Sequence, residues 1–354
     1  MHTNHRSHMT GRGKTARMKI LVTGGAGFIG SNFIRLALRE TSHKVVNLDA
    51  LTYAGNLENL KEIENNKRYR FVKSDIRDQK SVENILGEGI DAVVNFAAES
   101  HVDRSILDPA SFLQANYLGT AALLDACRKI PVKVFLQIST DEVYGPLLKG
   151  LADEGYELKP SSPYSASKAG ADLLCKSYQA TFGIPVVIAR MSNNYGPFQF
   201  PEKLIPLFIS NALEDRQLPV YGDGLYVRDW IFVEDACSAL LLILEEGKVG
   251  EVYNVGGGNQ RTNLEVTQVI LKELKKSKRL VKHVADRPGH DRRYALNSGK
   301  IKRDLGFEPA VEFEQGLRMT VKWYLENKDW WQRVKSGAYQ LYYEQQYGKR
   351  LKKK

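Results

Sequence analysis

Short apolar segments rich in β-branched residues alternate with helical segments over residues 19–190, and this alternation constrains the fold more than any other feature. We expect strands at residues 19–23, 44–49, 69–73, 92–96, 132–139 and 185–190. We expect the main helices between them at residues 27–39, 80–86, 109–129 and 163–182. Strands that alternate with helices pair in parallel, and right-handed crossovers then produce a doubly wound sheet covered on both faces. The sequence therefore predicts an α/β fold.

The alternation fades after about residue 190, where glycine and proline separate shorter elements. We expect strands there at residues 218–221, 229–233 and 251–255, and helices at residues 233–246, 263–275 and 313–327. A chain of 354 residues is long enough for two such units. We predict a Rossmann-type domain at residues 18–190. Residues 191–347 are predicted to form mainly a smaller, mixed α/β substrate lobe, interleaved with the first domain.

The net charge of +10 suggests a nucleic-acid binder until its position is examined. Residues 1–17 carry four basic side chains and no acidic one, and residues 349–354 carry five basic side chains and no acidic one. These nine residues account for nearly all of the net charge, whereas a polyanion-binding surface needs charge on a folded face. We expect a disordered basic extension at 1–17, a basic tail at 348–354 and no nucleic-acid partner.

Three further features of the sequence indicate which kinds of protein it does not encode. No apolar run approaches the roughly 20 residues of a membrane helix, so we expect no membrane partner. The N-terminus lacks the apolar core of a signal peptide. The three cysteines, Cys127, Cys175 and Cys237, are widely spaced, which favours a reducing compartment. We expect a cytoplasmic protein without a metal site.

A glycine-rich loop directly after the first strand predicts a dinucleotide site. Gly24, Gly27 and Gly30 stand where the chain must turn tightly and bring backbone N–H groups at a helix N-terminus close to phosphate. The second strand ends in Asp49, whose carboxylate suits a ribose 2′-hydroxyl and would repel a 2′-phosphate. Asp75, after the third strand, suits the adenine. These features favour NAD over NADP.

Tyr164 and Lys168 are four residues apart at the start of a predicted helix, which places them on one face. A phenol with a pKa of about 10 is a poor base at neutral pH, but a nearby ammonium favours its ionised form. We therefore expect Lys168 to lower the pKa of Tyr164. The pair could then take a proton from an alcohol while hydride leaves its carbon.

The fifth predicted strand leads into three polar residues, Thr140, Asp141 and Glu142. Ligands bind beyond the carboxyl ends of strands in an open α/β sheet, so these side chains should face the cofactor. Thr140 can hydrogen-bond a substrate oxygen beside Tyr164. Adjacent acids in one site suggest separate roles, Asp141 as general acid and Glu142 as general base.

With residues 23–30 and the Tyr164/Lys168 pair, the chain resembles the extended short-chain dehydrogenase/reductases, which include nucleotide-sugar epimerases and dehydratases. Within them it is similar to the dTDP-glucose 4,6-dehydratase family. That resemblance covers about residues 18–347, and the segments that carry it are residues 97–104, 139–145, 192–197, 200–206, 227–230, 286–290 and 330–331. The Thr140-Asp141-Glu142 sequence is its most specific part, because the related UDP-glucose 4-epimerases lack the acid pair.

The resemblance implies a reaction. Tyr164, helped by Thr140 and Lys168, would deprotonate the glucose 4-hydroxyl while hydride passes to NAD. Glu142 would remove the C5 proton, and Asp141 would protonate the departing C6 hydroxyl. Hydride would then return to C6, giving dTDP-4-dehydro-6-deoxyglucose and water for deoxysugar biosynthesis, with dTDP-rhamnose as the expected branch.

The resemblance also implies two sets of binding residues. The cofactor set comprises Gly24, Gly27, Phe28, Ile29, Gly30, Asp49, Leu51, Thr52, Asp75, Ile76, Ala97, Ala98, Tyr164 and Lys168. The nucleotide-sugar set comprises Ser100, His101, Asn193, Asn194, Lys203, Leu204, Pro219, Tyr221, Arg228, Asn263, Arg287 and His290. A homodimer through the helices near residues 109–129 and 163–182 is implied as well.

Alternatives remain open at this point. A UDP-sugar 4-epimerase or a UDP-sugar dehydratase would use the same fold, and no single residue distinguishes thymine from uracil. A non-catalytic NAD-binding sensor would have the same glycine loop. The retained Thr140, Tyr164 and Lys168 argue against the sensor.

Overall fold

The computed structural model describes residues 16–336 and 338–352. The predicted disorder of the N-terminal extension falls almost entirely on residues 1–15, which lie outside the described residues. No helix among the described residues is long and apolar enough to cross a membrane.

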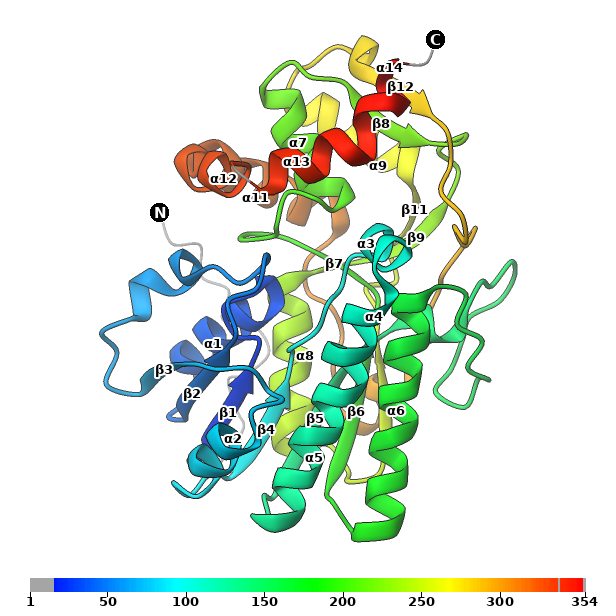
Figure 1. Ribbon diagram of the computed structural model, residues 1–354. Helices are drawn as coiled ribbons and strands as arrows, with labels where there is room; N and C mark the ends of the chain where they lie inside the picture. The colour runs from blue at the N-terminus through cyan, green and yellow to red at the C-terminus, as the bar shows by residue number, and fades with distance from the viewer. Residues whose placement is uncertain (1–15, 337, 353–354) are drawn as a thin grey trace.

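The core of the fold is a parallel sheet of seven strands in the order β10-β6-β5-β4-β1-β2-β3 (Figure 1). Every neighbouring pair is parallel. The strands are β1 (Lys19–Thr23), β2 (Lys44–Asp49), β3 (Tyr69–Lys73), β4 (Ala92–Asn95), β5 (Val134–Thr140), β6 (Val186–Met191) and β10 (Val252–Val255). The prediction of a Rossmann-type sheet is confirmed, and the six strands expected before residue 190 all form.

Helices cover both faces of this sheet. The main helices are α1 (Phe28–Glu40), α2 (Gln79–Leu86), α5 (Gly119–Lys129), α6 (Pro163–Phe182) and α8 (Val233–Glu246). Side chains alternate along β1, so Ile20 and Val22 pack in the core that α1 and α8 cover. Leu21 points the other way, into the core that contains residues of α2, α5 and α6. Two apolar layers thus hold the sheet rigid between helices.

The remaining elements are short. Ahead of β6 lie η1 (Leu57–Ile63), α3 (Val102–Leu107), α4 (Pro109–Phe112), the π-helical η2 (Leu113–Leu118) and η3 (Asp141–Tyr144). The lobe above the sheet contains β7 (Asn193–Tyr195), α7 (Leu204–Leu213), β8 (Leu218–Tyr221), β9 (Val227–Phe232), β11 (Gln260–Thr262), α9 (Asn263–Glu273), η4 (Lys278–Leu280) and β12 (Val281–Val284). The chain ends with α10 (Gly299–Leu305), α11 (Phe313–Glu326), α12 (Lys328–Val334), α13 (Ala338–Tyr343), η5 (Glu344–Gly348) and α14 (Lys349–Lys352).

The chain crosses between the two units more than once. Strand β10, expected as a lobe element, pairs with β6 and completes the large sheet. Helix α8 packs against α1 before the chain returns to the lobe. The boundary between the two units at residue 190 therefore stays a prediction. Strand β10 and helix α8 come from beyond that boundary and pack with the first unit. Helix α7 was not anticipated, because its almost wholly apolar sequence has little amphipathic pattern.

The basic C-terminal segment does not simply extend into solvent. Residues 344–352 form η5 and α14, and Arg350 donates a hydrogen bond to the Tyr221 hydroxyl at 2.8 Å. Part of the charge that the sequence places in a tail thus belongs to the folded lobe.

A buried ion pair fastens α6 to the sheet. Arg190 of β6 donates from Nε to Asp172 of α6 at 2.8 Å, and both side chains are essentially inaccessible to solvent. Arg190 also donates to the Tyr144 hydroxyl at 3.0 Å. Because α6 carries Tyr164 and Lys168, this pair helps to set where those residues lie relative to β5 and β6.

We expect Asp172→Ala to lower the free energy of unfolding by about 3–5 kcal/mol, because it leaves the Arg190 guanidinium buried without its counter-ion. Urea unfolding followed by circular dichroism measures this. Glu326→Ala, which breaks the exposed pair with Lys322, should leave the midpoint unchanged. Equal midpoints for the two variants would show that the buried pair does not anchor α6.

Candidate active site

One cavity opens at the carboxyl ends of the parallel strands. It is lined by residues that follow β1, β2, β3, β4, β5 and β6, together with residues from the start of the lobe. Asp49 is the last residue of β2 and Thr140 the last of β5, so the strand directions bring their side chains to the same edge. All the predicted catalytic residues line this cavity, as do all the predicted cofactor residues except Leu51.

Two glycines of the loop are required because neighbouring backbone lies too close to them for a side chain. Gly24 has φ +66°, and a Cβ there would lie 2.6 Å from the Ala97 backbone nitrogen. A Cβ on Gly30 would lie 2.5 Å from the Gly24 carbonyl oxygen. Gly27 is the N-cap of α1 without a side-chain hydrogen bond, which leaves the helix N-terminus open to a phosphate.

The predicted ribose carboxylate is held firmly. Asp49 accepts hydrogen bonds from the backbone N–H groups of Ala26 at 2.9 Å and Leu51 at 2.8 Å. Leu51 thus contributes its backbone, in a left-handed conformation with φ 53°, rather than a cavity-lining side chain. Asp75 lines the cavity and is paired with Arg77 of its own turn at 2.7 Å. Each carboxylate oxygen of Asp49 has a second lone pair for a ribose hydroxyl.

Asp141 and Glu142 directly follow β5, at the start of the short helix η3 whose N-terminus the Thr140 side chain caps. Thr140 Oγ1 accepts from the Glu142 backbone N–H at 3.3 Å and donates to Asp141 Oδ1 at 3.2 Å. Burial raises the pKa of Asp141 well above its usual value, and Glu142 and Asp229 raise it further. Burial also raises the pKa of Glu142, but Arg287, Lys203 and Arg228 oppose that effect. Burial thus favours the neutral form of both carboxyl groups, and three cations oppose this effect at Glu142.

The tyrosine does not have the lowered pKa that the sequence suggests. Burial raises the pKa of Tyr164, Glu142 and Asp141 add to the increase, and only a hydrogen bond with Thr140 opposes it. Lys168 donates from Nζ to the Ile138 carbonyl oxygen at 2.6 Å, and burial lowers the pKa of its ammonium. The expected lowering of the Tyr164 pKa is wrong for this structure, because burial of the phenol and the carboxyl groups near it outweigh the hydrogen bond that opposes them.

The predicted substrate residues separate into two groups. Ser100, Asn193, Asn194, Lys203 and Leu204 line the main cavity. Lys203 donates from Nζ to the Ser100 carbonyl oxygen at 2.6 Å. The side-chain oxygens of Asn193 and Asn194 are buried without a hydrogen-bond partner among the described residues. These atoms are free to interact with a ligand.

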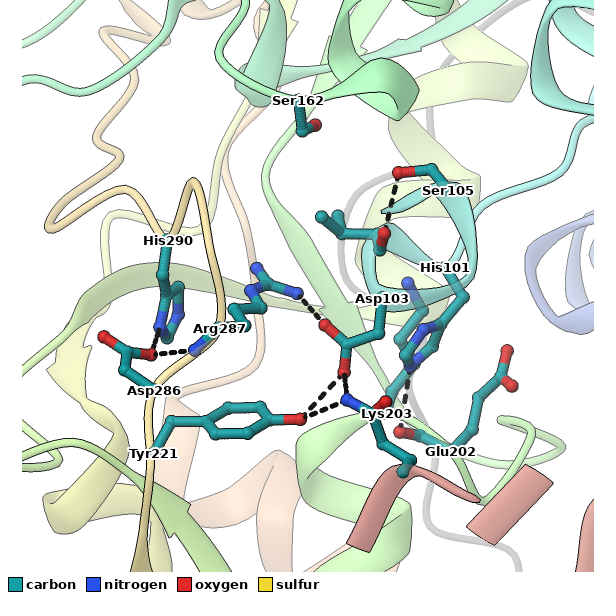
Figure 2. Close-up of polar contacts among 12 residues, drawn as sticks. His101, Asp103, Ser105, Ser162, Glu202, Lys203, Tyr221, Asp286, Arg287 and His290 are labelled. Atoms are coloured by element: carbon teal, nitrogen blue, oxygen red, sulfur yellow. Dashed lines mark hydrogen bonds and ion pairs between the residues drawn. The ribbon is translucent and has the colours of Figure 1, made fainter. Parts of the chain in front are cut away.

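The second group lies outside the lining of that cavity, in and around the lobe. It comprises His101, Pro219, Tyr221, Arg228, Asn263, Arg287 and His290. Several of these residues are held by a polar cluster (Figure 2). His290 stacks on Tyr226 with ring centroids 3.7 Å apart and contacts Asp286 at 2.7 Å. Arg228 donates to the carbonyl oxygens of Val227 and Asp291.

Comparison with known proteins agrees with this geometry. A family model described as GDP-mannose 4,6 dehydratase matches residues 21–320. A dTDP-glucose 4,6-dehydratase of Neisseria meningitidis is 51% identical over 91% of this chain and 98% of its own. The crystal structure of DesIV, a dTDP-glucose 4,6-dehydratase from Streptomyces venezuelae with NAD and dTDP bound, aligns with a TM-score of 0.88 at 48% identity, covering 90% of this chain and 100% of that chain.

The chain belongs to the dTDP-glucose 4,6-dehydratase family.

The fold alone does not separate this dehydratase family from its neighbours. A UDP-glucose 4-epimerase of Thermotoga maritima aligns with a TM-score of 0.82 at 32% identity, over 88% of this chain and all of that chain. The higher identity to the dehydratases, 51% and 48% against 32%, places this chain with them.

Sequence reasoning missed three polar residues that the dehydratase fold brings to the site. Trp230 and Gln199 line the cavity with a buried nitrogen and a buried oxygen that have no partner among the described residues. Asp103 lies between Tyr221 and Arg287. Asp103 and Trp230 lie inside segments that carry the family resemblance, but nothing in their local sequence shows which polar groups face them.

Proposed function

We propose that the chain converts dTDP-glucose to dTDP-4-dehydro-6-deoxyglucose and water with NAD as cofactor, in deoxysugar biosynthesis with dTDP-rhamnose as the expected branch. The observation that carries this proposal is the acid pair Asp141 and Glu142, which faces the same cavity as Tyr164. Epimerisation needs oxidation at C4, whereas loss of water from C5 and C6 also needs one acid and one base. Two carboxyl groups in one buried site can supply both, and the cations Arg287, Lys203 and Arg228 around Glu142 favour it as the base.

Tyr164 and Thr140 act first in this proposal, at the glucose 4-hydroxyl. Tyr164 accepts the hydroxyl proton, and the Thr140 hydroxyl, which already hydrogen-bonds the phenol, holds the sugar oxygen next to it. Bound NAD supplies a hydride acceptor and, in its oxidised form, a positive charge that favours the Tyr164 phenolate. The hydrogen bond from Lys168 to the Ile138 carbonyl oxygen holds the Lys168 ammonium in this part of the site.

The acid pair acts next. A ketone at C4 acidifies the C5 hydrogen, and Glu142 removes it as a proton. The electron pair of that C–H bond forms the C5–C6 double bond, and the C6–O bond breaks. Asp141 donates a proton to the departing hydroxyl, which leaves as water. Hydride would then add to C6 as Glu142 returns a proton to C5, so that the C5–C6 double bond is consumed and the cofactor would be restored in each turnover.

The deciding experiment is incubation of the purified chain with dTDP-glucose in heavy water. We expect mass spectrometry to show loss of one water, with solvent deuterium at C5, because Glu142 exchanges its proton with solvent during elimination. UDP-glucose at the same concentration is the comparison and should react more slowly. Formation of dTDP-galactose, or no reaction in the presence of NAD, would contradict the assignment.

Glu142→Gln tests the base. The amide keeps the shape of the side chain but cannot accept a proton, so water loss should fall by about 10²–10⁴-fold. Oxidation at C4 should remain, seen as partial formation of reduced nicotinamide by absorbance. Glu157→Gln, at an exposed glutamate paired with Lys159, is the matched control and should behave as the unmodified chain. Unchanged turnover in Glu142→Gln would remove this residue from the mechanism.

We also propose that the protein works in the cytoplasm. Cys127, Cys175 and Cys237 are free thiols buried in the core, as expected in a reducing compartment. We further propose that residues 18–190 bind the cofactor and that mainly residues 191–347 bind the nucleotide sugar.

A homodimer is supported by apolar side chains exposed on one set of helices. Leu113 and Leu118 of η2 are 52% and 53% exposed, and Leu173 of α6 is 57% exposed. Helices α5 and α6 pack against each other and against η2, so these side chains belong to one packed group of helices (Figure 1). Apolar surface of this kind marks an interface.

We expect light scattering after size exclusion to report a dimer, and the double variant Leu118→Glu/Leu173→Glu to report a monomer, because each charge would be desolvated in the interface. Leu225→Glu, at an exposed leucine of the lobe, is the control and should remain dimeric. A monomeric unmodified chain would exclude this interface.

A further inference from the structure

A buried carboxylate joins three segments that are far apart in the sequence. Asp103 of α3 is 4% exposed, and its Oδ1 accepts a hydrogen bond from Arg287 Nη1 at 2.7 Å. Its Oδ2 accepts from the Tyr221 hydroxyl at 2.9 Å and from Gln346 Nε2 at 2.8 Å. Figure 2 shows this carboxylate between the Arg287 guanidinium and the Tyr221 ring. The loop after β12, the end of β8 and the C-terminal segment therefore meet at one side chain.

The charge on Asp103 is permanent over any working pH. Burial by itself would raise the pKa of a carboxyl group, but Arg287 and His101 oppose it, and the hydrogen bonds from Arg287 and Tyr221 add to their effect. The resulting pKa is about 2. Asp103 is thus a constant counter-charge for Arg287 rather than a group that exchanges protons.

Arg287 links Asp103 to the acid pair. Its side chain is only 15% exposed, and its Nε has no hydrogen-bond partner among the described residues. Its positive charge is the foremost of those that oppose the rise in the Glu142 pKa, which places the guanidinium in the field of that carboxylate. With Nη1 on Asp103 and Nε unpaired among the described residues, the guanidinium has a buried donor left for a ligand anion.

The Tyr221 hydroxyl, which donates to Asp103, has two further hydrogen-bond partners. It accepts from Gln346 Nε2 at 2.7 Å and from Arg350 Nη1 at 2.8 Å, both from the C-terminal segment. Tyr221 and Arg287 both belong to the nucleotide-sugar set that the family resemblance implies. Tyr221 also lies opposite Val284 in the β8–β12 pair, and its ring centroid is 5.9 Å from that of His290, so backbone pairing and Asp103 together hold it near Arg287.

We propose that Asp103 is a positioning residue for substrate. Asp103 orients Arg287 and Tyr221 together, so that a nucleoside diphosphate meets a cation and an aromatic ring that are already in place. Gln346 holds the Asp103 carboxylate in position. This inference rests on the proposed function. A guanidinium without a buried counter-ion would reorient toward water or another acid, and the ligand would then have to restore its position on binding. The cost falls on binding, because Asp103 does not touch the reacting atoms.

Asp103→Asn is the primary test, since it keeps the size of the side chain and removes its charge. We expect the KM for dTDP-glucose and the Kd for dTDP, measured by calorimetry, to rise about tenfold, while kcat stays within about twofold. The amount of NAD that copurifies should be unchanged. Asp223→Asn is the matched control, because Asp223 pairs with Arg292 of the same loop at an exposed position. It should alter neither constant.

Two further variants separate positioning from folding. Gln346→Ala removes one donor from Asp103 while the pair with Arg287 remains, and it should raise KM about threefold at constant kcat. In an Arg287→Met background, adding Asp103→Asn should raise KM less than it does in the unmodified chain, because one of the two groups that Asp103 orients is already gone. Independent, multiplying effects would overturn the proposal, and so would an Asp103→Asn variant whose KM and dTDP affinity match those of the unmodified chain.

The outcomes distinguish this inference from the function on which it rests. Dehydration of dTDP-glucose by the unmodified chain, with unaltered constants in Asp103→Asn and Gln346→Ala, would leave the function standing and exclude the positioning role. An unmodified chain that neither binds dTDP nor releases water would exclude both.

Discussion

Parallel pairing of the seven strands is the constraint on which the rest of the structure depends. Because every neighbouring strand runs in the same direction, the residues that end β1, β2, β4, β5 and β6 come to one edge. The register places Thr140 opposite Met191 and Thr23 opposite Asn95. The glycine loop, the ribose carboxylate and the acid pair are far apart along the chain, and the register alone brings them to a common cavity.

Burial then decides what these groups can do. Asp141 and Glu142 are adjacent in sequence and chemically alike, yet cations of the lobe oppose the effect of burial on Glu142 more than on Asp141. The lobe therefore takes part in the acid–base chemistry without supplying the reacting groups. Arg287 contributes to this charge balance, and Asp103 is the carboxylate that pairs with it.

Local signals predicted much of the fold. Helix α6 begins and ends where expected because Ser162 forms a capping box with Ser165, Pro163 follows it, and Gly183 ends the helix in a left-handed conformation. The predicted strands before residue 190 form because each is a short apolar run. The place of β10 could not be predicted, since a four-residue apolar strand fits either sheet and only its partner decides. The C-terminal contacts through Gln346 and Arg350 carry no local pattern at all.

The sequence by itself determined the sheet, the glycine loop and the family to which the chain belongs, and it predicted the catalytic set, because strand periodicity, glycine spacing and short motifs are local properties of the chain. Only the tertiary structure decided the direction in which the pKa values of Tyr164, Asp141 and Glu142 shift, and the partners of Asp103. A pKa depends on burial and on charges from segments distant in sequence, as the raised pKa of Tyr164 beside Lys168 demonstrates. Those distances exist only once the lobe is folded onto the sheet.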